Sequence, residues 1–154
     1  MPANRLIPSL LFALLWLAAC TPPRAFPPPN STPGGNWSVQ LTQTGGFAGV
    51  QLYIQVSSDG MLTAEDKRSG RRVSSPVSPE RMAELSRLLG QVKAPTAKRP
   101  PSVCADCFVY DLEIASGSGL VRIQADDMDL SASGAQALIQ LLGQMRDQAL
   151  RSGT

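Results

Sequence analysis

The 154-residue chain contains no histidine, the side chain that most often serves as a general base and as a metal ligand. Its absence excludes the catalytic triads that depend on histidine and histidine-based zinc sites. Carboxylate chemistry by Asp111 and Glu113 is the enzymatic alternative, but both alternate along a predicted strand with no sign of a pocket. The sequence therefore predicts a non-enzymatic protein with no catalytic residues, metal or cofactor.

Charge of one sign is also lacking. The chain has 14 basic and 12 acidic residues in a mixed distribution, and Arg5 is the only charged residue among the first 19. Without that segment, 13 basic residues would face 12 acidic ones. A nucleic-acid partner would require a basic face, so we expect none.

Long apolar runs are confined to the start of the chain. The segment from Leu6 to Ala19 is almost wholly apolar, follows Arg5, and is too short for a stable spanning helix. Its end, Leu-Ala-Ala-Cys at 17–20, resembles the bacterial lipobox. This predicts a signal peptide at 1–19, a lipid on Cys20 and membrane anchoring in the cell envelope, with Thr21 favouring the outer membrane. The alternative is an ordinary secretory signal that leaves Cys20 as a free thiol.

Residues 20–36 contain six prolines, at 22, 23, 27, 28, 29 and 33. Proline at this density favours an extended, semi-rigid tether without a core. We therefore expect a folded domain at 37–154, which the tether would hold away from the membrane surface.

The strongest strand pattern is Val50 to Val56, in which apolar and polar residues alternate. Similar alternation and flanking turn residues predict further strands. These are Trp37 to Thr42, Met61 to Glu65, Phe108 to Ile114 and Leu120 to Ala125. The basic run from Lys67 to Arg72 is either an anion-binding patch or a solvated hairpin turn, and the second is favoured because it has no aromatic neighbours.

Two amphipathic helices complete the expected fold. Ser78 and Pro79 are a typical cap and first residue, and the leucines that follow form one stripe. A second leucine-rich stripe predicts a helix from Ser133 to Leu150, capped by Ser131 or Ser133. We predict an α+β fold: a single antiparallel sheet of about four to five strands, with two helices on one face and the other face partly open. We expect a monomer.

Cys104 and Cys107 allow several interpretations. Zinc would require two more ligands, and only Cys20 is left. A thioredoxin-like pair begins a helix, whereas these residues lead into a predicted strand. In an exported protein, a small disulfide that pins the loop is favoured, and a reducible or unformed bond is the alternative.

The acidic run Asp-Asp-Met-Asp at 126–129 could be interpreted as a calcium loop. It lacks the glycine and the distal carboxylate that such loops carry at fixed spacing. We interpret it as negative charge that complements the start of the final helix.

With these elements in place, the chain from about Ser38 to Leu150 resembles emfourin, a small protein inhibitor of protealysin-like and thermolysin-like zinc metallopeptidases. Matching pieces occur in order along the chain. They are Gly-Gly-Phe-Ala-Gly at 45–49 before an alternating strand, the helix with Leu85, Asp-Cys-Phe-Val-Tyr-Asp-Leu-Glu-Ile at 106–114, a strand ending in Asp-Asp at 126–127, and the leucine-rich final helix. The lipobox, the proline tether and the Cys104–Cys107 pair depart from the family pattern.

The resemblance implies that the domain blocks the cleft of a thermolysin-like metallopeptidase. The family of those enzymes favours large apolar side chains beside the scissile bond, so the loops with Phe47 and Phe108 are candidate contacts. The candidate contact residues are Gly45, Gly46, Phe47, Asp106 and Phe108. Phe108 is in phase with the apolar side of its strand, which favours burial, and Phe47 could be buried or exposed. The alternative function is an envelope assembly module that binds another envelope protein or cell-wall material through the open sheet face.

Overall fold

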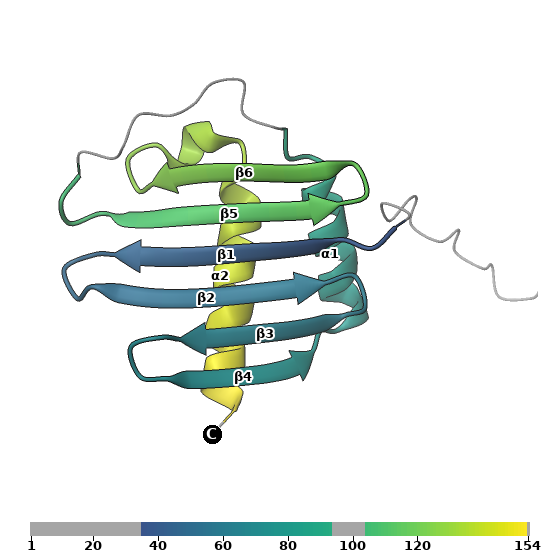
Figure 1. Ribbon diagram of the computed structural model, residues 1–154, viewed down its shortest axis with the longest axis horizontal. Coiled ribbons are helices and arrows are strands. Elements are labelled where there is room, and N and C mark those ends of the chain that lie inside the picture. The colour runs from purple at the N-terminus through teal and green to yellow at the C-terminus, as the bar shows by residue number, and fades with distance from the viewer. Residues whose placement is uncertain (1–34, 94–103, 154) are drawn as a thin grey trace, which may run out of the picture.

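The protein is a six-stranded antiparallel sheet with two helices on one face (Figure 1). The computed structural model describes residues 35–93 and 104–153, so the predicted leader, Cys20 and most of the predicted tether lie outside the described ranges. The strand order is β4-β3-β2-β1-β5-β6. The strands are β1 Ser38–Gly45, β2 Val50–Ser57, β3 Met61–Asp66, β4 Arg71–Pro76, β5 Phe108–Ser116 and β6 Gly119–Asp126. The helices are α1 Pro79–Leu89 and α2 Gln136–Ser152, with a short 3₁₀ helix, η1 Leu130–Ser133, before α2. The α+β class and the helices on one face are confirmed.

The sheet has six strands instead of the predicted four to five, because β4 was assigned in part to a basic turn. Only residues 67–70 turn, and Arg71 begins β4, which pairs antiparallel with β3. Val73 is the only aliphatic side chain in this strand, so the alternation that identifies a half-buried strand is almost absent. An edge strand can form on so weak a pattern because it has one paired side and a short apolar face.

The core lies between the sheet and the helices. Leu41 on the central strand β1 pairs with Ile54 on β2 and with Leu112 on β5, and all three are buried. Leu85 of α1 and Leu142 of α2 are fully buried in the same cluster. Burying one such side chain stabilises the fold by roughly 2 kcal/mol, so these rows account for the register of the three central strands.

The sheet face away from the helices is polar. By alternation it presents Gln40 and Thr42 from β1 and Tyr53 and Gln55 from β2. The Tyr53 hydroxyl donates to the Gln55 side-chain oxygen at 2.8 Å. Polar side chains lose little when they stay hydrated, and this face therefore needs no covering layer.

The two helices differ in how well the sequence predicts their starts. Ser78 caps α1 as predicted, accepting the Arg81 amide, and Gly90 follows its last residue. The second helix begins at Gln136 rather than at Ser133. Gly134, with φ of 70°, separates η1 from α2, and the Ser133 hydroxyl accepts the Ala135 amide between them. The left-handed glycine is the reason that the two helical segments do not merge.

Candidate functional site

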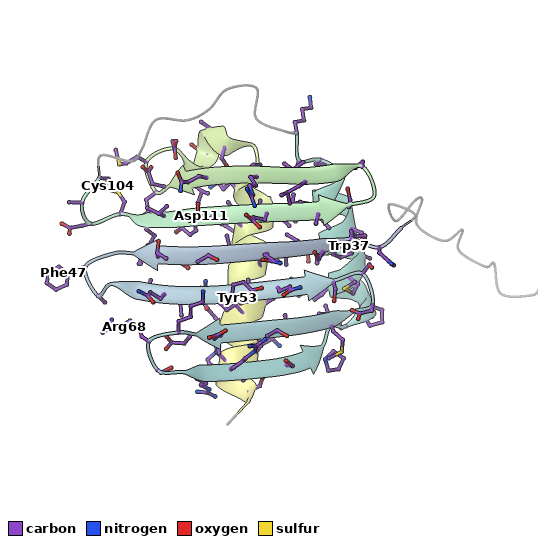
Figure 2. The ribbon with its side chains drawn as sticks, viewed as in Figure 1. Trp37, Phe47, Tyr53, Arg68, Cys104 and Asp111 are labelled. Carbon is purple, nitrogen blue, oxygen red and sulfur yellow. A yellow bond between two sulfur atoms is a disulfide. The ribbon has the colours of Figure 1, made fainter. Side chains whose placement is uncertain are left out.

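One edge of the sheet gathers most of the residues singled out by sequence. Antiparallel pairing places the β1–β2 turn, the β3–β4 turn, the chain entering β5 and the chain leaving β6 on this edge (Figure 1). We call these the Phe47 turn (46–49), the Lys67 turn (67–70), the disulfide loop (104–107) and the Asp127 turn (127–129), and together the Phe47 edge. In Figure 2, Phe47, Arg68 and Cys104 lie along this side, whereas Trp37 lies at the other.

Phe47 projects from the edge with 99% of its surface exposed. The question that the sequence left open is therefore decided in favour of exposure. Gly46 and Gly49 on either side take φ of 67° and 59°, and the Gly49 amide donates to the Gly46 carbonyl at 2.9 Å. A phenylalanine side chain gains roughly 1.5–3 kcal/mol when it is removed from water, and the domain itself does not use that energy here.

The Phe47 turn is fixed on one side by the disulfide loop. The Gly46 amide donates to the Cys107 carbonyl at 3.0 Å. A Cβ atom at Gly45 would lie 2.5 Å from that carbonyl oxygen, and one at Gly46 would lie 2.4 Å from the Phe108 ring. Both glycines are thus needed for close approach between the two segments, in addition to their positive φ values.

The disulfide predicted from the sequence is present. Cys104 and Cys107 are bonded, with 5.5 Å between their Cα atoms, and they close a four-residue ring directly before β5. Asp106 within this ring is exposed. The ring limits the freedom of the carbonyl that holds the Phe47 turn.

Phe108 is half-buried and does not belong to the main core, contrary to the phase of its strand. Because Phe108 pairs with Gly45, its ring lies over the glycine backbone at Gly46. Its position supports the Phe47 turn, whereas Phe47 itself is free to contact a partner.

Asp127 connects the disulfide loop to the Asp127 turn. Its carboxylate accepts the Phe108 amide at 2.7 Å and the Tyr110 hydroxyl at 3.0 Å. Burial raises the pKa of Tyr110 to about 12, and the Asp127 carboxylate adds to the rise. The sequence interpretation of Asp127 as charge for the final helix missed this contact, since only an acidic pair at the end of a strand signalled it.

The Lys67 turn holds the Phe47 turn from the other side. The Arg68 guanidinium donates to the Ala48 carbonyl, and the Lys67 amide donates to the Gln51 carbonyl at 2.9 Å. Asp66 shapes this turn by accepting the Ser69 hydroxyl at 2.8 Å, and that hydrogen bond lowers the pKa of its carboxyl. The basic run predicted as a solvated turn therefore also contacts the neighbouring hairpin.

A shallow pocket lies beside the Phe47 turn. It is lined by Val50, Leu52, Asp66, Arg68 and Ser69. Two aliphatic side chains and three polar ones form a surface suited to a side chain of another protein. Within residues 35–93 and 104–153, no three Cys, Asp or Glu side chains are grouped so that they could hold a metal ion.

No protein-family model matches the chain, and no curated protein is significantly similar to it. Among the described residues, no helix is both long enough and apolar enough to cross a membrane. The geometry of the Phe47 edge is that of a contact surface: an exposed aromatic side chain on a turn held from both sides.

Proposed function

We propose that the protein is a non-enzymatic envelope lipoprotein whose domain binds and inhibits a secreted or periplasmic thermolysin-like zinc metallopeptidase. The observation that carries the proposal is Phe47, which is 99% exposed on a turn bonded to both of its neighbours. The resemblance of the sequence to emfourin supplies the class of target. The domain would act by occupying the cleft, so no reaction is required of it.

Phe47 suits this role because apolar anchors at the centre of an interface provide most of its binding energy. Thermolysin-like enzymes favour large apolar side chains beside the scissile bond, and an exposed phenylalanine would fill such a pocket. Contacts from Cys107 and Arg68 fix the backbone of the turn before binding. A preorganised turn loses less conformational entropy on association, which strengthens binding.

The position of the proposed tether fits the same function. The chain enters the domain at Trp37, at the end of the sheet opposite Phe47 (Figure 2). In our proposal the lipid on Cys20 anchors the protein and residues 20–36 form the tether, with an extended length of about 50 Å. The Phe47 edge would then face away from the outer membrane, where a peptidase can reach it.

The test is a titration of thermolysin, and of each thermolysin-like peptidase encoded in the source genome, with the chain from Thr21 onward. We expect stoichiometric loss of peptidase activity. The Phe47→Ala variant should raise the inhibition constant about 30-fold or more, as expected for a central anchor. Leu120→Ala is the matched control, because Leu120 is 53% exposed on the opposite edge of the sheet.

Unchanged activity of all these peptidases at high excess of intact domain would overturn the inhibitor proposal. It would favour an envelope assembly module, for which the polar sheet face is the candidate surface. Circular dichroism and thermal unfolding of both variants show that any lost inhibition is not lost folding.

A further inference from the structure

Large apolar side chains that remain exposed fall on two edges of the described domain. Phe47 and Met128, at 99% and 79% exposure, both lie on the Phe47 edge. Met61 and Leu120 lie on the opposite edge and are 45% and 53% exposed. The more exposed pair is thus concentrated where the contact turn lies.

A single phenylalanine is too small to form a stable protein interface. It buries 150–250 Å² at most, whereas a standard interface buries roughly 800 Å² on each partner. A partner that receives Phe47 must therefore also cover neighbouring parts of the edge. The disulfide loop and the Asp127 turn are the neighbours on the β5 and β6 side.

Backbone contacts join Phe47 and Met128 into one rigid surface. Cys107 accepts the Gly46 amide, and the next residue, Phe108, donates its amide to Asp127. The Met128 amide in turn donates to the Asp126 carboxylate at 2.9 Å. Because β1 and β6 are separated by two strand spacings, the bases of the two turns lie about 10 Å apart.

An acidic group lies between the two apolar side chains. Asp106 is exposed in the disulfide loop, which separates the Phe47 turn from the Asp127 turn. Negative charge at this position favours a partner with a basic side chain and disfavours an anionic lipid surface.

We infer that Met128 is a second apolar anchor and that the contact surface extends from Phe47 across Asp106 to Met128. Its partner is a protein with two apolar pockets and a basic group between them. The inference rests on the proposed function for the identity of that protein as a thermolysin-like peptidase. It adds the second pocket and the basic group, which the resemblance does not supply.

The experiment measures association and dissociation rates by surface plasmon resonance, using the peptidase inhibited in the titration above. Met128→Ala should weaken affinity about 10-fold, mainly through faster dissociation, because it removes an apolar contact. Met61→Ala, the same substitution on the opposite edge, should leave both rates unchanged. Asp106→Lys should slow association at least 3-fold at low salt, and the difference should shrink as salt is added.

The outcomes separate this inference from the proposed function. Inhibition that depends on Phe47 but is unchanged in Met128→Ala would overturn the second anchor and leave the inhibitor proposal standing. Absence of inhibition by the unmodified chain would overturn the inhibitor proposal itself. Flotation with phosphatidylglycerol and phosphatidylethanolamine vesicles, if it depended on both Phe47 and Met128, would overturn a protein partner for this surface and indicate a lipid one.

Discussion

The two edges of the sheet use similar turns for different purposes. On the opposite edge, Asp59 accepts the Ser57 hydroxyl at 2.6 Å and the Met61 amide at 3.0 Å, so this turn is closed by its own residues. Ser58 and Trp37 exchange hydrogen bonds where the chain enters the domain. On the Phe47 edge, each turn is held by its neighbours, and an aromatic side chain is left in water. One edge secures the chain, and the other presents a side chain.

Substitution of a glycine on each edge gives the largest expected difference. Gly45→Ala places a Cβ atom 2.5 Å from the Cys107 carbonyl at a φ of 91°, and backbone must move to relieve the overlap. Gly60→Ala has a similar φ of 84° but nothing within 4 Å. We expect losses in unfolding free energy of roughly 3 kcal/mol at Gly45 and about 1 kcal/mol at Gly60. Urea unfolding measures both, and equal losses would show that the two turns are equally isolated.

Removal of a turn carboxylate should give the next largest difference. Asp127→Ala leaves the Phe108 amide and the Tyr110 hydroxyl without their acceptor, which should destabilise the domain by about 2 kcal/mol. Asp59→Ala breaks contacts within one exposed turn and should cost less. Inhibition should weaken only in Asp127→Ala, because only Asp127 supports the disulfide loop. A larger loss of stability in Asp59→Ala would contradict the division of roles between the edges.

Loss of the disulfide should affect inhibition more than stability. The ring has four residues, so the Cys104→Ser/Cys107→Ser double variant should lose at most about 2 kcal/mol of unfolding free energy. Freeing the Cys107 carbonyl loosens the Phe47 turn, and we expect about 10-fold weaker inhibition. Reduction of the unmodified chain with dithiothreitol should reproduce the change. Full inhibition by the reduced chain would show that the ring does not preorganise the turn.

The smallest expected effect is a shift in the titration of Tyr110. Its pKa rises from 10.0 to about 12 in the folded domain, first through burial and then through Asp127. Because the folded-state pKa is raised, this stabilising contribution is present below pH 10 and is lost as pH rises towards 12. Asp127→Asn removes the carboxylate charge and should move the pKa back towards 10. Tyrosinate absorbance measures the shift, with Tyr110→Phe to identify the signal among the two tyrosines.

The sequence predicted the parts of this fold that local patterns determine. Alternation located most strands, and Ser78 with Pro79 located the start of α1. It missed β4, whose only aliphatic residue is Val73, and the late start of α2, which depends on the left-handed conformation of Gly134. Such features carry little apolar periodicity, so pattern reasoning has almost nothing to detect.

The candidate site was predictable to a smaller extent. Sequence reasoning named the Phe47 turn and the cysteine pair, and the structure brings them together through the Gly46 and Cys107 backbones. It did not find Arg68 or Asp127, because their partners lie 20 and 19 residues away in the chain. Contacts between distant segments follow from strand order, and one sequence contains no direct signal for them.

The central position of β1 has a mechanical consequence. Its eight residues pair with both β2 and β5, and the strand runs from the entry of the chain beside Trp37 to the Phe47 turn. If a membrane anchor pulled on the first end while a bound partner held the other, the tension would act along this strand. The hydrogen bonds on both sides would then be loaded in shear, all at once, rather than opened one after another. A domain built in this way resists force along the line on which its proposed anchor and partner would pull.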